Sequence, residues 1–144
     1  MPAVWTIGYE QLWPDALVAE LEAAGIRRVL DVRLRPQSRR PGMSKTKVAL
    51  KLAEHGIAYE HRRELGTPLE IRGLYRAGRK EEAAAAYGAH VEAHAGAALD
   101  ALAGELDGPR TALLCLEADP AGCHRRVVAE RLRARVPELD VVDL

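Results

Sequence analysis

The sequence contains no phenylalanine, and aromatic residues make up only 4% of its 144 residues. The core therefore has to be built from Leu, Val, Ile and Ala, and a surface that stacks single-stranded bases on aromatic rings is disfavoured. Only two cysteines are present, which excludes the disulfide framework of small secreted proteins. No run of about eighteen apolar residues occurs, so nothing in the sequence indicates a helix that spans a membrane.

The chain also lacks the pattern of a secretory signal, which is a basic segment followed by an apolar stretch and a cleavage site. We therefore expect a reduced, cytoplasmic protein. Its 144 residues match the usual size of one domain, and 48% of them are hydrophobic, which is enough for a packed interior. We expect residues 1–144 to form a single domain.

The net charge is zero, but the charges are distributed unevenly along the chain. Residues 1–26 hold four acidic and no basic residues, and residues 81–144 hold twelve acidic against six basic residues. The middle segment, residues 27–80, holds fifteen Lys or Arg against five Asp or Glu. This local excess of positive charge indicates either an anionic partner or a solvated basic face that pairs with neighbouring acidic helices.

Short apolar segments alternate with helical patterns along the chain. We expect strands at residues 3–8, 27–33, 57–60, 110–117 and 139–144. We expect helices at residues 14–25, 45–56, 81–106 and 123–136. Pro14 suits the first turn of the first helix, Ser44 can cap the second, and Gly88 or Gly96 can break the third. Residues 61–80 carry turn signals and are expected to be irregular.

This alternation predicts an α/β fold, with a mainly parallel sheet of about five strands and helices on both faces. Right-handed crossovers restrict the topology, and we expect the strand order 3-2-1-4-5, with a switch point between the first and fourth strands. Ligands of open parallel sheets bind beyond the carboxyl ends of the strands. The polar residues that follow the predicted strands are therefore the candidates for a site.

Two groups of candidates stand at these strand ends. The expected ligand-binding residues are Gly8, Tyr9, Asp31, Arg33, Ser38, Arg39, Tyr59 and Arg125. The expected catalytic residues are Glu117, Cys123 and His124. Seven Lys or Arg and no acid lie between Val32 and Ala53, and arginine binds phosphate or carboxylate in a bidentate manner. The alternative is that these arginines only pair with carboxylates inside the protein, such as Asp31, Glu117 or Asp119.

The two cysteines leave several chemistries to weigh. A cysteine at a helix N-terminus beside cations is a good nucleophile, and Cys123 stands at such a place, with Glu117 or His124 able to move protons. Cys115 lies within the apolar fourth strand and is expected to be a core residue. Neither cysteine is followed by an arginine at the spacing of a phosphatase loop. Zinc ligands usually come as close pairs from two places, and these cysteines are eight residues apart, so we expect neither a metal ion nor a cofactor.

Four segments of the chain resemble, in this order, the motif series of the domain of unknown function 488 family: TIGYE, DVRLRPQSRRPGMSK, GIAYEHRRELGTP and LLCLEADPAGCHRR. Met43 departs from the series, because we expect an aromatic residue there in many members. The resemblance implies a compact α/β domain and no established activity. The motif residues that it carries over are Gly8, Tyr9, Asp31, Arg33, Pro36, Ser38, Arg39, Tyr59, Leu65, Gly66, Cys115, Glu117, Cys123, His124 and Arg125.

The sequence thus predicts an arginine-rich anion-binding site at the carboxyl ends of the strands, for binding or processing a phosphate-bearing ligand such as a nucleotide or a nucleic acid. Two alternatives stay open. One is a small-molecule enzyme that uses Cys123 and Glu117, and the other is a non-catalytic interaction domain whose polar cluster is structural. Whether the chain is an enzyme is left open by its residues. As partners we expect an anionic ligand and no membrane, with a homodimer as one arrangement to test.

Overall fold

The computed structural model describes residues 2–144, and its centre is one five-stranded parallel sheet. The strands are β1 (Ala3–Gly8), β2 (Arg28–Asp31), β3 (Ala58–His61), β4 (Thr111–Cys115) and β5 (Asp140–Asp143). Their order across the sheet is β3-β2-β4-β1-β5. The α/β fold that the alternating pattern predicts is therefore confirmed.

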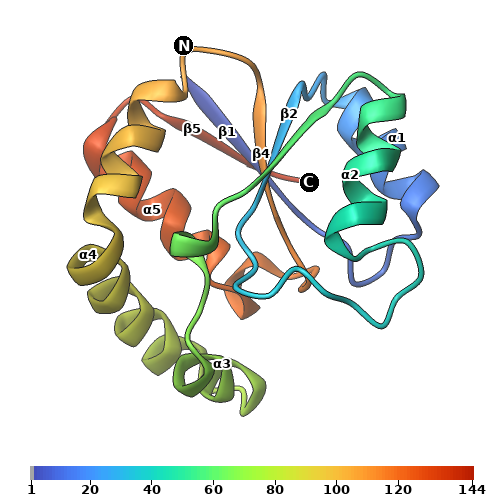
Figure 1. Cartoon of the computed structure of the whole chain (residues 1–144). Coiled ribbons are helices and arrows are strands. Elements are labelled where there is room, and N and C mark those ends of the chain that lie inside the picture. The colour runs from blue at the N-terminus through green and yellow to red at the C-terminus, as the bar shows by residue number, and fades with distance from the viewer. Residues whose placement is uncertain (1) are drawn as a thin grey trace.

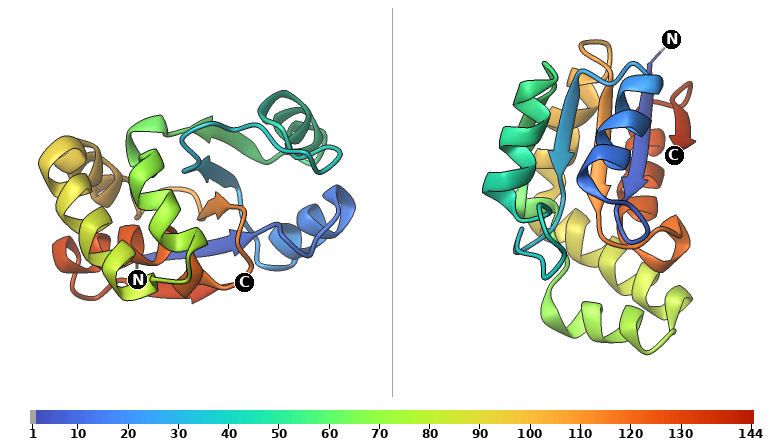
Figure 2. Two further views of the ribbon diagram at one scale, coloured as in Figure 1. Left: turned by 90° about the horizontal axis from the view of Figure 1, so that it is seen from below. Right: turned by 90° about the vertical axis from the view of Figure 1, so that its right-hand side faces the viewer.

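Five helices and two short 3₁₀ turns connect the strands. The helices are α1 (Pro14–Ala23), α2 (Lys45–Glu54), α3 (Leu69–Arg76), α4 (Lys80–Glu105) and α5 (Arg125–Arg135). The turns are η1 (Arg63–Leu65) and η2 (Pro120–Gly122). Helices α1 and α2 cover one face of the sheet, α4 and α5 cover the other, and α3 packs beside α4 (Figure 1). The sheet accordingly lies between two helical layers, as the left view of Figure 2 shows.

The predicted strand order 3-2-1-4-5 is wrong at its centre, because β4 lies between β2 and β1. All five residues of β4 are buried, and the most apolar strand is the one that best tolerates a central position covered on both faces. Strands β1 and β4 are still neighbours, and the helices that follow them, α1 and α5, pack on opposite faces of the sheet. The connections diverge between β2, which continues to β3, and β4, which continues to β5, so the switch point lies between the second and fourth strands and not between the first and fourth as predicted.

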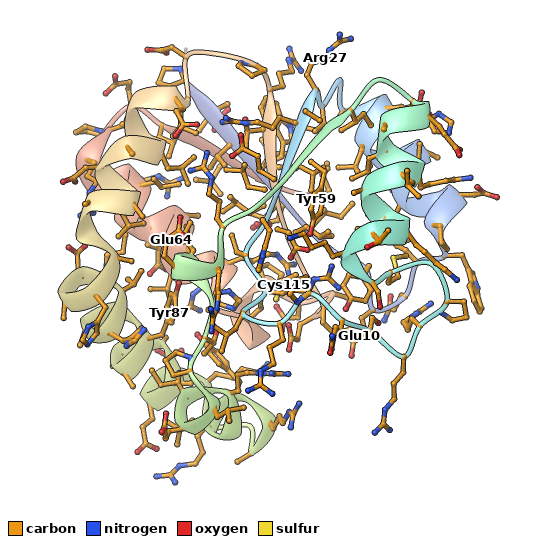
Figure 3. The ribbon with its side chains drawn as sticks, in the orientation of Figure 1. Glu10, Arg27, Tyr59, Glu64, Tyr87 and Cys115 are labelled. Carbon is orange, nitrogen blue, oxygen red and sulfur yellow. The ribbon has the colours of Figure 1, made fainter. Side chains whose placement is uncertain are left out.

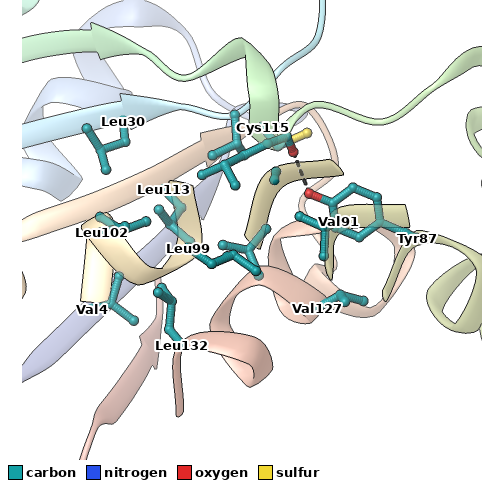
Figure 4. Packing of buried hydrophobic residues seen from close by; sticks show 14 of the residues in the cluster. Val4, Leu30, Tyr87, Val91, Leu99, Leu102, Leu113, Cys115, Val127 and Leu132 are labelled. Carbon is teal, nitrogen blue, oxygen red and sulfur yellow. Dashed lines mark hydrogen bonds between the residues drawn. The ribbon is translucent and has the colours of Figure 1, made fainter. Parts of the chain in front are cut away.

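The core consists of two aliphatic clusters, one on each face of the sheet. The cluster under α4 and α5 includes Val4, Leu30, Val91, Leu99, Leu102, Leu113 and Leu132, part of which is drawn in Figure 4. The cluster under α1 and α2 includes Ile7, Leu17, Leu21, Val29, Val48, Leu52 and Leu114. Leucine, valine and isoleucine thus fill the interior without any phenylalanine.

Three local predictions need correction. Residues 61–80 are not irregular throughout, because α3 forms there as a short helix with one buried apolar residue, Ile71. Ser44 precedes α2 as expected, but its Oγ accepts a hydrogen bond from the backbone N–H of Ser38 at 2.9 Å instead of capping the helix. The last helix begins at Arg125 and not at residue 123, since Cys123 has an extended backbone after the η2 turn.

Helix α4 is interrupted by a kink, as its glycines suggest. The backbone leaves helical geometry at Ala95, directly before Gly96, which was one of the two predicted break points. The 26-residue helix begins beyond the carboxyl end of the sheet beside α3, and after the kink it runs along the sheet toward the opposite end (Figure 1). Within residues 2–144, none of the helices is both long and apolar enough to cross a membrane.

Candidate functional site

A cleft of about 100 Å³ lies at the carboxyl end of the sheet, where the segments after β1, β2 and β4 meet α3. Figure 3 labels Cys115 at this end of β4. The residues that line the cleft are Tyr9, Arg33, Leu34, Arg35, Gln37, Thr67, Arg72, Tyr75, Arg76, Cys115, Leu116, Glu117, Cys123 and His124. The arrangement follows from the parallel sheet, because the exits of its three central strands open at the same edge.

The cleft brings together the two segments that the sequence singled out. Arg33 and Arg35 come from the loop after β2, whereas Glu117, Cys123 and His124 come from the segment after β4, and all five line the same cleft. The three residues expected to be catalytic are therefore neighbours in space. Their chemical roles stay predictions, because proximity alone does not assign a reaction.

Arg33 is held by a buried network of hydrogen bonds. Its Nε and Nη2 donate to the two carboxylate oxygens of Asp31 at 2.8 and 2.7 Å, and its Nη1 donates to Met43 O at 2.8 Å and to Tyr9 Oη at 3.1 Å. Tyr59 donates to the same carboxylate at 2.5 Å. Arg33 is only 6% exposed and Asp31 is fully buried. Most donors of Arg33 are thus used within the protein, as the alternative interpretation of the arginines expects.

The electrostatics of this network agree with its geometry. Burial alone would lower the pKa of Arg33, but the hydrogen bonds and the negative charge of Asp31 outweigh it and raise that pKa above the usual range for arginine. Burial, followed by the neighbouring Asp31 carboxylate, raises the pKa of Tyr59. Asp31 and Tyr59, both expected to bind the ligand, lie outside the set of cleft-lining residues and instead hold Arg33 in place.

Ser38 and Arg39, which were also predicted to bind the ligand, lie in the loop after β2 outside the cleft. The Oγ of Ser38 accepts a hydrogen bond from the backbone N–H of Arg40 at 3.1 Å, and the backbone of Ser38 bonds to Ser44. Arg39 is exposed and lies outside the cleft-lining set. The loop turns away from the cleft after Gln37, which explains why neither side chain reaches it.

Gly8 and Arg125 shape the cleft from beneath without lining it. A Cβ atom on Gly8 would lie 1.7 Å from Glu117 O, so only glycine permits the close approach of β1 to the loop after β4. Arg125 is fully buried and donates to the backbone carbonyls of Glu117 and Ala118, the latter at 3.0 Å. Both residues hold the loop that carries Glu117, and the prediction that they bind a ligand directly does not match these positions.

Three cleft-lining arginines have no side-chain partner in the described chain. Among residues 2–144, Arg35, Arg72 and Arg76 form no ion pair and no side-chain hydrogen bond. Arg72 and Arg76 were absent from the predicted site, because α3 was not expected to be a helix. Their spacing of four residues, which places both on one helical face, was the signal that could have found them.

Two buried hydroxyl groups beside these arginines also have no partner in the part of the chain that the structure describes. They are Thr67 Oγ1 and Tyr75 Oη, and both residues line the cleft. Burial raises the pKa of Tyr75, as do the nearby sulfur atoms to a smaller extent, so its hydroxyl keeps its proton. Buried polar atoms in proteins are nearly always paired, so these two hydroxyls mark a position where a polar ligand or water completes the site.

The floor of the cleft is a cluster of two thiols and one imidazole. His124 Nδ1 lies 3.6 Å from Cys123 Sγ and 3.9 Å from Cys115 Sγ, and Cys115 Sγ lies 3.4 Å from Glu117 Oε2. Hydrogen bonding to Cys123, together with burial, raises the pKa of Cys115, which therefore stays protonated as an isolated thiol. Cys115 was expected to be a core residue, and it is buried, but its sulfur also faces the cleft. The three donor atoms lie within 4.8 Å of one another, close enough to ligate one metal ion.

Comparison with curated proteins and with solved structures gives no match to the chain. A family model described as a domain of unknown function, DUF488, matches residues 14–132. This range spans most of the chain and contains three of the four motif segments, while TIGYE precedes it. It also contains every cleft-lining residue except Tyr9. The chain therefore belongs to the DUF488 family.

Proposed function

We propose that the cleft binds a phosphate-bearing ligand, either a nucleotide or an end of a nucleic acid, through Arg35, Arg72 and Arg76. The observation that carries this proposal is that three arginines lining one cleft form no ion pair and no side-chain hydrogen bond within the described chain. Arginine is always charged and its planar fork of donors matches the oxygens of a phosphate. Like charges that line one cleft repel each other, so an anion bound among these arginines relieves an unfavourable arrangement.

The unpartnered hydroxyls of Thr67 and Tyr75 add donors of the kind that a phosphate oxygen accepts. Both lie in the described cleft beside Arg72 and Arg76, which are carried by the adjoining helix α3. A bound phosphate oxygen would accept a hydrogen bond from each hydroxyl and remove the cost of leaving it unpaired. The positive charge of the arginines and the two hydroxyl donors therefore both favour a phosphate group as the ligand.

The size of the cleft limits which part of the ligand enters it. Its volume is about 100 Å³, whereas sites for whole drug-sized ligands occupy about 300–1,000 Å³. One phosphate group fits this space, and a base with its sugar does not. We expect the phosphate to enter the cleft and the nucleoside to stay at its mouth, near the exposed Arg35 and Arg76.

The proposal is tested by calorimetric titration of the reduced protein at low salt with inorganic phosphate, a nucleoside monophosphate and a short 5′-phosphorylated oligonucleotide. Charged hydrogen bonds contribute roughly 1.5–3 kcal/mol, so Arg72→Gln and Arg76→Gln should each weaken binding by about tenfold or more. Arg39→Gln is the matched control, because it removes an exposed arginine of the same loop region outside the cleft. Its affinities should stay within about twofold of those of the native chain.

The three titrants separate the sources of the phosphate. Equal affinity for phosphate and nucleotide indicates a site that reads the phosphate alone, and tighter binding of the oligonucleotide with a strong salt dependence indicates a nucleic-acid end. The proposal is overturned if none of the three binds at low salt, or if Arg39→Gln weakens binding as much as Arg72→Gln does.

A second candidate function is covalent chemistry on the bound ligand, supported by the position of Cys123 beside His124 Nδ1 in the same cleft. A neutral imidazole nitrogen near a thiol can accept its proton and leave a nucleophilic thiolate. A soluble iodoacetamide reagent should then alkylate Cys123 faster than a free thiol at neutral pH, and His124→Gln should slow the reaction. Labelling no faster than that of free cysteine would remove this candidate.

A further inference from the structure

We propose that Cys115, Cys123 and His124 bind one divalent transition-metal ion, zinc being the best fit, with a fourth coordination position that faces the cleft. This inference does not depend on the anion site, because the ligand atoms differ from the arginines that would hold a phosphate. Zinc prefers sulfur and nitrogen donors, and two cysteines with one histidine are a known ligand set for zinc sites that keep one position open. The cluster supplies this donor set from buried residues.

The distances between the donor atoms suit a tetrahedral ion. With metal bonds of about 2.3 Å to sulfur and about 2.0–2.1 Å to nitrogen, tetrahedral angles separate a sulfur from a nitrogen ligand by roughly 3.6 Å. The two sulfur-to-Nδ1 distances are 3.6 Å for Cys123 and 3.9 Å for Cys115. An ion can therefore sit between the three atoms with small side-chain adjustments.

His124 is already oriented as a metal ligand. Its Nε2 lies 2.7 Å from the backbone carbonyl of Val32, which can only accept a hydrogen bond, so the proton is on Nε2 and the lone pair of Nδ1 points at the two sulfurs. The edge of the Tyr87 ring packs against the imidazole, with ring centroids 5.1 Å apart. Histidine ligands of metals typically donate their second N–H to a carbonyl or carboxylate in this way.

Charge and access also favour a metal ion. Binding releases one proton from each thiol to solvent, and the two resulting thiolates neutralise the two positive charges, so a neutral centre lies in a buried place. All three ligand residues line the cleft, which gives the ion an entry path. A water molecule can complete the coordination and leave the centre neutral, whereas the Glu117 carboxylate, 3.4 Å from Cys115 Sγ, would give it one negative charge.

The spacing of the two cysteines hides this site in the sequence. They are eight residues apart and lack a second close pair, so the sequence predicts no metal. In the fold, Cys115 ends β4, and the η2 turn brings the chain back so that Cys123 and His124 stand over the same strand end. The only two cysteines of the chain therefore meet in one cluster.

The test uses the full chain, purified under a phosphine reductant, freed of metal with a chelator and shown by thiol titration to hold two free thiols. Cobalt(II) is then titrated, followed by zinc in competition with a chromophoric chelator. We expect one cobalt per chain, with the intense visible bands of tetrahedral coordination and a thiolate-to-cobalt charge-transfer band, and displacement of cobalt by one zinc. Zinc should also raise the thermal unfolding midpoint, because it binds the native state.

Variants locate the ion. Loss of groups that merely orient zinc ligands costs about 10–100-fold in affinity, so Cys123→Ser and His124→Gln should each cost more than about 100-fold. His94→Gln, which changes an exposed histidine on α4, is the control and should leave affinity unchanged. Circular dichroism confirms that each variant is folded, and if His124→Gln does not fold, Cys115→Ser replaces it.

Two results would overturn the proposal. One is the absence of stoichiometric cobalt uptake, or a cobalt spectrum without the thiolate band, in a chain with both thiols free. The other is a loss of zinc affinity in His94→Gln as large as that in Cys123→Ser. Neither result bears on phosphate binding, which is measured with the arginine variants in metal-free protein.

Discussion

At the scale of single residues, the arginines of the cleft differ in what their donors already hold. The guanidinium group of Arg33 donates hydrogen bonds to Asp31, Tyr9 and Met43. Arg35 has no side-chain partner in the described chain. Sequence patterns place both near a strand end, but they do not reveal which guanidinium is already bonded. This is why the predicted site mixes residues that line the cleft with residues that support it.

Replacing Arg33 should mainly lower the stability of the folded protein. Arg33→Met leaves the buried Asp31 carboxylate without its ion-pair partner, and breaking such a pair costs about 3–5 kcal/mol. We expect the free energy of unfolding in urea to fall by that amount. Arg35→Gln, which removes an exposed arginine of the same loop, should change it by less than about 0.5 kcal/mol. A loss below about 1 kcal/mol for Arg33→Met would contradict the structural role of the network.

At the scale of elements, helix α3 is the main difference between the predicted site and the observed one. Gly66, Pro68, Gly73 and Gly78 surround or interrupt it with turn signals, and its amphipathic pattern extends over only eight residues, so the turn signals dominate the prediction. Strongly patterned elements such as β1 and α2 were predicted to within about two residues. A short, exposed helix depends on its packing beside α4, which local sequence does not encode.

Two glycines around α3 offer a matched pair of substitutions. A Cβ atom would meet nothing within 4 Å at either Gly73 or Gly78, but Gly78 has a φ of +79°. Gly73→Ala should therefore raise the free energy of unfolding by about 0.5–1 kcal/mol, because alanine favours a helix interior. Gly78→Ala should lower it by about 1 kcal/mol or more, because a side chain strains the left-handed conformation. Urea unfolding that gives both variants the same sign would contradict a helix that contains Gly73 and ends before Gly78.

The sheet shows a second limit of local patterns. Five strands and parallel pairing follow from the alternation of elements, but the exchange of β1 and β4 at the centre does not. Both orders satisfy right-handed crossovers, and the apolar composition of the β4 segment was the sequence signal that favoured a central place for it. The site was still predicted at the correct edge, because every parallel order opens the strand ends there.

At the scale of the whole molecule, the basic middle segment is only partly neutralised by its acidic neighbours. Arg28 and Arg62 both pair with Glu105 of α4, and Lys51 of α2 pairs with Asp15 of α1. These contacts support the interpretation of the charge asymmetry as internal pairing for part of the segment. Arg35, Arg72 and Arg76 of the cleft are among the residues of the segment that form no ion pair in the described chain, and they carry the proposed function.

One buried and two half-buried tyrosines predict how the stability of the molecule depends on alkaline pH. Burial is the largest cause that raises the pKa of Tyr59, Tyr75 and Tyr87 above the usual value of 10. A raised pKa in the folded state means that the unfolded chain loses the proton first, so the stabilisation is complete below pH 10 and is lost as the pH rises above it. Above pH 10, each such tyrosine lowers the free energy of unfolding by up to about 1.4 kcal/mol for each further pH unit.

Urea unfolding between pH 8 and pH 12, with tyrosinate absorbance recorded in parallel, measures this decline. Tyr59→Phe should decline less steeply than the native chain above pH 10, because it removes one of the three groups. Ionisation of all tyrosines near pH 10 in a chain that is still folded would show that these hydroxyls are open to solvent.

The phosphate-binding cleft is tested most directly by a crystal structure of the reduced chain grown with a saturating nucleoside monophosphate. The account predicts one phosphorus position in the cleft, with Arg72 and Arg76 in contact with its oxygens and with Thr67 and Tyr75 donating their unpaired hydroxyls. A nucleotide bound elsewhere on the molecule, with the cleft holding only water, would contradict it.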